Sequence, residues 1–142
     1  MTKTNVRIPV AIATLLLLAS TVLPQLPPNP KPAFTMSVDR QMNGAVPGTS
    51  ATYKVYLTPV GAFVGTVVLD CDMSVPYEGY SISPSQVRLG PMVAAVATIT
   101  IRVKPGAPEG MTHFMLHARA TGPTPTWGDS HSMPLHLMVI PK

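Results

Sequence analysis

One stretch of the sequence alternates methionine with histidine, two residue types that bind soft metal ions. It reads Met111-Thr-His113-Phe-Met115-Leu-His117. Side chains of an extended strand point alternately to its two faces, so these methionines and histidines would share one face. The apolar residues between them, Phe114 and Leu116, would point into a core. The pattern therefore predicts a β-strand with an outer face of thioethers and imidazoles.

A stretch near the C-terminus has a similar outer face, where Pro134, His136, Met138 and Ile140 alternate with inward apolar residues. Thioether and imidazole groups suit copper, so copper binding is one interpretation. Same-face residues on a strand are about 6.6 Å apart, and such a site would need ligands from a neighbouring strand. The candidate copper ligands are Met111, His113, Met115, His117, His136 and Met138.

The interpretation we favour for this face is contact with another protein. An exposed apolar patch usually marks an interface, and methionine adapts to irregular surfaces. A third possibility is a mildly apolar face that stays in water. The expected partner interface includes two valines from an adjacent strand. Its residues are Val64, Val68, Met111, His113, Met115, His117, His136, Met138 and Ile140.

Other residues with reactive side chains do not form a catalytic set. Cys71 shares the inward parity of Val67 and Leu69, which predicts a small buried thiol. Asp70 and Asp72 face outward but offer too few oxygens for calcium. The run 129–131, Asp-Ser-His, cannot form a triad because adjacent side chains do not orient one another. We therefore expect neither an enzyme nor a bound cofactor.

Short alternating segments recur between turn signals after residue 33 and indicate an all-β fold. We expect a seven-stranded antiparallel sandwich with turns at Asn43-Gly44 and Pro47-Gly48. No helical period follows residue 33. The expected strands cover residues 34–38, 51–58, 63–72, 80–82, 97–103, 114–120 and 135–139.

Residues 34–140 resemble the bacterial immunoglobulin-like domains of secreted and surface proteins. The segments that carry the resemblance are Gly48-Thr-Ser-Ala-Thr-Tyr-Lys-Val55, Phe63-Val-Gly-Thr-Val-Val-Leu69, Ser81-Ile-Ser-Pro84, Ala97-Thr-Ile-Thr-Ile-Arg-Val103 and Ala107-Pro-Glu-Gly110. The resemblance implies a domain that adheres, spaces or assembles rather than one that catalyses. Unlike antibody domains, this chain has a single cysteine and so forms no intrachain disulfide.

The sixteen uncharged residues Ile8–Leu23 follow Lys3 and Arg7 and predict a transmembrane helix of about 24 Å. The alternative is a cleaved secretory signal, although the best cleavage site, Ala19-Ser-Thr21, is poor. Basic residues before the span place the N-terminus in the cytoplasm. Pro24–Pro32 holds five prolines and predicts an extended stalk. The expected division is 1–23 anchor, 24–33 stalk and 34–142 sandwich, with residues 8–23 in contact with lipid.

The formal charge of +4 arises mostly from the N-terminal segment, since seven basic and six acidic residues remain from Phe34 onward. This balance argues against nucleic-acid binding. We expect a non-catalytic accessory subunit of a bacterial membrane complex, of respiratory or photosynthetic type. It would lie in the inner membrane with its sandwich in the periplasm. The alternatives are a periplasmic copper-binding module and a surface filament or adhesion subunit.

Overall fold

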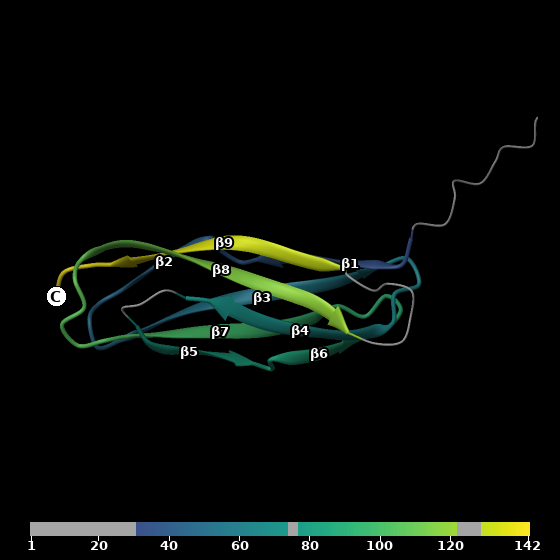
Figure 1. Ribbon diagram of the computed structural model, residues 1–142, viewed down its shortest axis with the longest axis horizontal. Coiled ribbons are helices and arrows are strands. Elements are labelled where there is room, and N and C mark those ends of the chain that lie inside the picture. The colour runs from purple at the N-terminus through teal and green to yellow at the C-terminus, as the bar shows by residue number, and fades with distance from the viewer. Residues whose placement is uncertain (1–30, 74–76, 122–128) are drawn as a thin grey trace, which may run out of the picture.

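The computed structural model describes residues 31–73, 77–121 and 129–142, which form two facing β-sheets (Figure 1). Within these ranges no helix is long and apolar enough to cross a membrane. The predicted anchor over residues 8–23 and the stalk as far as residue 30 lie outside the described residues. The strands are β1 (Ala33–Val38), β2 (Met42–Ala45), β3 (Ser50–Val60), β4 (Gly65–Asp72), β5 (Tyr77–Ser83), β6 (Gln86–Leu89), β7 (Ala95–Val103), β8 (Gly110–Thr121) and β9 (Ser130–Val139).

One sheet has the strand order β1-β3-β7-β5 and the other β2-β9-β8-β4-β6. The predicted sandwich is confirmed, but the described residues form nine strands where the sequence predicted seven. The prediction of a wholly antiparallel fold is wrong at one place, because β2 pairs with β9 in parallel. The two strands that the prediction missed, β2 and β6, are the four-residue edges of the larger sheet.

Both missed strands continue an earlier strand after the chain has crossed to the other sheet. Residues 39–41 carry the chain from β1 to β2, and the predicted Asn43-Gly44 turn is part of β2. At this crossing the Asp39 carboxylate accepts a hydrogen bond from the Lys54 N–H at 2.9 Å, and the Gln41 carbonyl accepts one from His136 N–H at 2.8 Å. Four residues are too few for a two-residue period to identify a strand.

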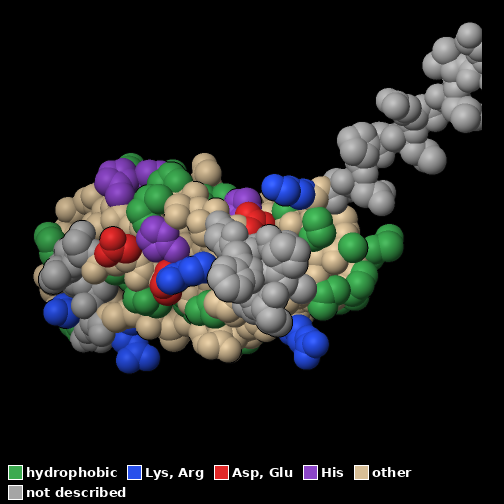
Figure 2. Space-filling model, turned by 45° about the vertical axis from the view of Figure 1, so that its right-hand side comes forward, with side chains coloured by type: hydrophobic (Ala, Val, Ile, Leu, Met, Phe, Trp, Pro, Cys, Tyr) green, Lys and Arg blue, Asp and Glu red, His purple; other side chains and the backbone are tan. Residues whose placement is uncertain are grey.

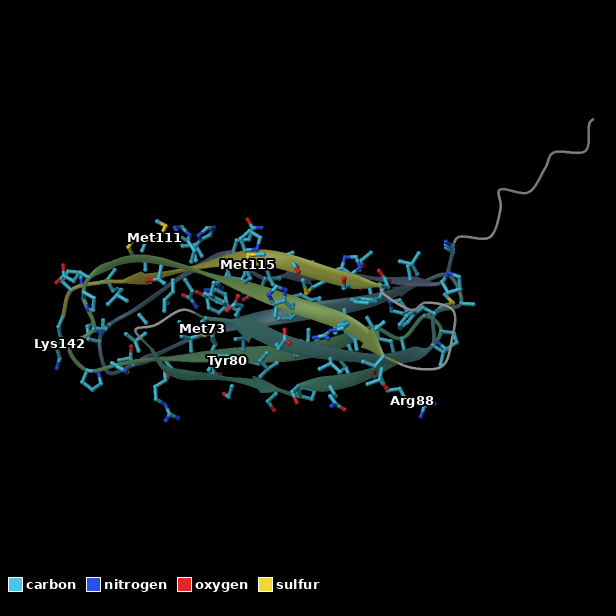
Figure 3. The ribbon with its side chains drawn as sticks, in the orientation of Figure 1. Met73, Tyr80, Arg88, Met111, Met115 and Lys142 are labelled. Atoms are coloured by element: carbon cyan, nitrogen blue, oxygen red, sulfur yellow. The ribbon has the colours of Figure 1, made fainter. Side chains whose placement is uncertain are left out.

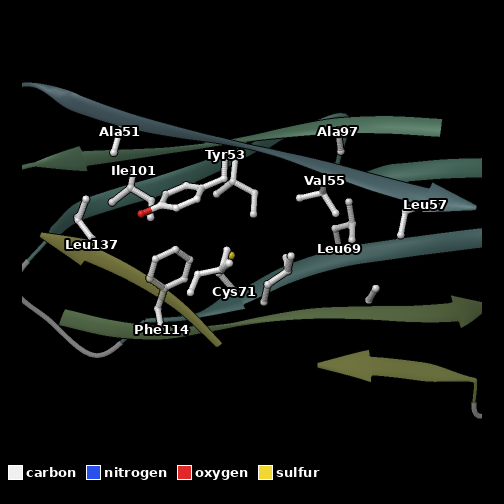
Figure 4. Packing of buried hydrophobic residues seen from close by; sticks show 14 of the residues in the cluster. Ala51, Tyr53, Val55, Leu57, Leu69, Cys71, Ala97, Ile101, Phe114 and Leu137 are labelled. Atoms are coloured by element: carbon white, nitrogen blue, oxygen red, sulfur yellow. The ribbon is translucent and has the colours of Figure 1, made fainter. Parts of the chain in front are cut away.

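The core lies between the sheets and follows the predicted alternation closely. Along β3 the inward Ala51, Tyr53, Val55 and Leu57 are buried, while the residues between them are exposed. Tyr53 packs edge-on against Phe114 of β8, with ring centroids 5.6 Å apart, as Figure 4 shows. Its hydroxyl donates a hydrogen bond to the His136 carbonyl at 2.7 Å. This contact joins the centre of one sheet to the other.

The sandwich is elongated, and the two ends of the described chain lie at opposite ends of it (Figure 1). Residue 31 leads into β1 at one end. At the other end β9 runs out to Lys142, beside the beginning of β8, because Gly110 pairs with Val139.

A methionine and histidine surface on the larger sheet

Strand register gathers most of the predicted methionine and histidine ligands on the outer face of the five-stranded sheet. In the β8–β9 pair His113 lies opposite His136 and Met111 opposite Met138. In the β2–β9 pair Met42 lies beside His136. We call the group formed by Met42, Met111, His113, Met115, His136 and Met138 the Met/His cluster. Figure 2 shows histidine and hydrophobic side chains together at one end of the molecule, and Figure 3 shows Met111 and Met115 along β8.

The two histidines of the cluster contact each other directly. His113 Nδ1 and His136 Nδ1 lie 2.5 Å apart, and the rings are almost perpendicular at 87°. One ring therefore donates a hydrogen bond and the other accepts it. The pair lies between Met111 and Met138 on one side and Met115 on the other along the strands. Two imidazole nitrogens are thus directed at one point in a thioether-rich surface.

Met42 was not among the predicted site residues. Its side chain is 55% exposed and lies on the outer face of β2 beside His136. The sequence concealed it because Asn43-Gly44 carries the signal of a turn. The alternation of Met42 with Gly44 across from His136 and Met138 becomes visible only when β2 is paired with β9.

Val64 and Val68, which were predicted to extend the interface, are not part of the cluster. Val64 precedes β4, and Val68 lies between Arg119 of β8 and Gln86 of β6. Ile140 follows β9 and is adjacent to Gly44 at the edge of the cluster, as its Cδ1 would lie 3.8 Å from a Cβ on that glycine. The apolar surface therefore extends toward β2 rather than toward β4.

His117 shares the face but belongs to a separate polar group. Its Nδ1 lies 2.7 Å from Ser132 Oγ, and Asp70 is opposite it on β4. These are the residue types of a catalytic triad, yet the Asp70 carboxylate lies 3.6 Å from Arg119. Among the described residues, no ion pair joins Asp70 to His117. The carboxylate does not orient the imidazole, so the group lacks the relay that activates a serine.

Two other candidates have structural roles in the described part of the chain. The Cys71 thiol is buried as expected; burial, with a smaller contribution from the Asp70 carboxylate, raises its pKa to about 12. A thiol of this kind is a poor nucleophile at neutral pH. Asp129, assigned above to the polar run 129–131, accepts a hydrogen bond from Phe34 N–H at 3.0 Å and lies 3.3 Å from His131 Nε2. It connects the start of β1 to β9.

The outer face of the smaller sheet is polar. Apart from the opposed pair Tyr56 and Val96, its central strands present hydroxyls and cations. The residues of this kind on β3 and β7 are Ser50, Thr52, Lys54, Thr58, Thr98, Thr100 and Arg102. The two outer faces of the sandwich therefore differ in chemistry, and the apolar one carries the Met/His cluster.

Comparison with known proteins identifies the fold and nothing finer. No described protein family matches the sequence, and no curated protein is significantly similar to it. Three solved structures share the architecture. They are domains 4 and 5 of the S-layer protein SbsC (20% identity, TM-score 0.50, 78% of this chain and 54% of that one), the E. coli chaperone DraB (15%, 0.52, 77% and 56%) and a PapD-like domain of human CEP192 (13%, 0.51, 88% and 96%).

The chain spans a little over half the length of the first two of these structures, 54% and 56%. At 13% to 20% identity the likeness is one of fold alone. The described residues form an immunoglobulin-like, PapD-like β-sandwich. This class hosts many functions, so the function must be argued from the surface of the domain.

Proposed function

We propose that this protein is a non-catalytic accessory subunit whose sandwich docks on another protein through the Met/His cluster and Ile140. The observation that supports this is the contrast between the two outer faces. Met42, Met111 and Ile140 are 55%, 49% and 42% exposed on one face, whereas the other face is rich in serine and threonine. Exposed apolar side chains that adjoin one another favour burial against a partner.

The proposed setting is a bacterial inner membrane. Residues 8–23 would cross the bilayer, with Lys3 and Arg7 in the cytoplasm and the sandwich in the periplasm. The proposed partner is an extramembrane subunit of a larger membrane complex of respiratory or photosynthetic type. The uncharged segment and the basic residues before it support the anchor and its orientation.

The experiment is purification of the full chain from native membranes in mild detergent, with and without charges on the docking face. Met111→Asp with Met138→Asp places two carboxylates opposite each other on the outer face. We expect co-purifying subunits to fall at least tenfold while thermal unfolding changes little. The matched control is Thr100→Asp on the outer face of the other sheet, which should retain the subunits.

Each alternative gives a different result in the same purification. Homopolymers that the double variant disperses would favour a filament subunit. Recovery of the wild-type chain as a monomer without other subunits would contradict docking. Equal loss in the Thr100→Asp control would show that the wrong face had been assigned.

A further inference from the structure

We propose that His113 and His136 bind one Cu(I) ion through their Nδ1 atoms, with thioether ligands from Met111 and Met138. This site goes beyond the docking role, because it gives the same surface a specific small ligand. The two imidazole nitrogens are already directed at each other at 2.5 Å. Met111 and Met138 are the next outward residues along both strands and lie opposite each other.

The strand pairing removes the main objection to a metal site on this surface. Outward residues of one strand are about 6.6 Å apart, too far to share an ion along the strand alone. Residues directly opposite on antiparallel strands have Cβ atoms only about 4.5–5.5 Å apart. His113 with His136, and Met111 with Met138, are both direct cross-strand pairs. Two adjacent pairs therefore supply two imidazoles and two thioethers to one region of the sheet.

The donor types select the metal. Thioethers are soft ligands that favour Cu(I), whereas zinc takes thiolate, imidazole and carboxylate. In the described part of the chain, no three histidine, cysteine or acidic side chains gather as a conventional metal site. With only two such ligands, zinc would lack a third protein ligand here. We therefore expect Cu(I) to bind much more tightly than Zn(II).

Loading the site requires a small movement of the rings. With metal–nitrogen bonds of about 2.0 Å and a tetrahedral angle, the two nitrogens would lie about 3.3 Å apart. Both rings are at the surface, His113 exposed and His136 half-buried, so side-chain rotation can provide the separation. Each Nδ1 must offer a lone pair, so both neutral rings would carry their proton on Nε2. No residue is oxidised or reduced, and the ion enters as Cu(I).

The test is competition for Cu(I) between the purified full chain and a chromogenic chelator under anaerobic conditions. We expect one Cu(I) per chain with submicromolar Kd, and no comparable binding of Zn(II). His113→Ala with His136→Ala should weaken binding at least a hundredfold. His117→Ala, which alters a histidine of the same strand outside the cluster, should leave binding unchanged. Binding weaker than micromolar in the wild type, or equal loss in the control, would overturn the proposal.

A second variant separates this proposal from docking. Met111→Leu with Met138→Leu keeps the surface apolar but removes two thioethers, so Cu(I) affinity should fall at least tenfold while partner subunits still co-purify. X-ray absorption of the loaded wild type should show sulfur together with nitrogen neighbours. An ion coordinated by nitrogen and oxygen alone would refute the thioether site, whatever the outcome of the docking experiment.

Discussion

Tyr53 is a fully buried phenol whose hydroxyl bonds to the backbone of the opposite sheet. The partner of that hydroxyl, the His136 carbonyl, belongs to the residue whose imidazole contacts His113 on the outer face. An interior hydrogen bond thus helps to hold the backbone that supports the Met/His cluster. A buried acceptor that loses its donor retains the cost of leaving water.

We therefore predict that Tyr53→Phe lowers the free energy of unfolding by about 1–3 kcal/mol, because the His136 carbonyl is left unpaired in the core. Tyr56→Phe removes the same hydroxyl from a partly exposed ring on the outer face of β3 and should have almost no effect. Urea unfolding of both variants measures the difference. Equal midpoints would show that the Tyr53 hydrogen bond contributes no net stability.

At the scale of strands, adjacent residues have opposite environments, and β4 provides a clear pair. Leu69 is 3% exposed in the core, whereas Val68 lies on the outer face between Arg119 and Gln86. Leu69→Asp should cost roughly 4 kcal/mol or more and prevent folding, because it buries an unpaired charge. Val68→Asp should fold with wild-type circular dichroism. A folded Leu69→Asp protein would contradict the assigned register of β4.

The crossing between β1 and β2 depends on an acidic side chain and should be sensitive to acid. Although partial burial tends to raise the pKa of Asp39, hydrogen bonds from the Lys54 N–H and Arg40 outweigh it and lower the pKa. A carboxyl with a lowered pKa stabilises the fold above its unfolded value of about 3.9, and the contribution disappears as the pH falls through the folded value.

Asp39→Ala should therefore destabilise the protein at pH 7, and the difference from wild type should shrink below about pH 4. Because the side chain is largely exposed, the effect should be small. Urea midpoints at several pH values measure it, with Glu109→Ala, at an exposed loop carboxylate, as the control. A wild-type advantage that persists unchanged at pH 2 would rule out the proposed contribution of Asp39.

Seven of the nine strands could be predicted from the sequence because each is long enough for its alternation to be counted, as in β3 and β7. The same parity correctly placed Cys71 inward and the methionines of β8 outward. It could not reveal β2, whose Asn43-Gly44 is typical of a turn, nor the position of β4 beside His117 rather than beside β9. Those facts depend on which strands become neighbours, and a local period carries no such information.

At the scale of the whole molecule, the two outer faces divide its surface chemistry. The smaller sheet presents hydroxyls and cations to water, and the larger sheet gathers exposed thioethers beside its paired imidazoles. The inner faces are alike in being apolar, so a common core supports two different exteriors. This arrangement lets substitutions on the outer faces test docking and copper binding without disturbing the core.

The strand pairing that joins Gly110 to Val139 also brings Lys142 close to the cluster and places it at the far end of the sandwich from residue 31. An affinity tag fused after Lys142 would therefore hang over Met138 and Ile140. A polyhistidine tag there would bring extra imidazoles to the proposed metal site and bulk to the proposed contact surface. Recombinant protein is better purified through a handle at the opposite terminus, and a C-terminal fusion can serve as a deliberate block.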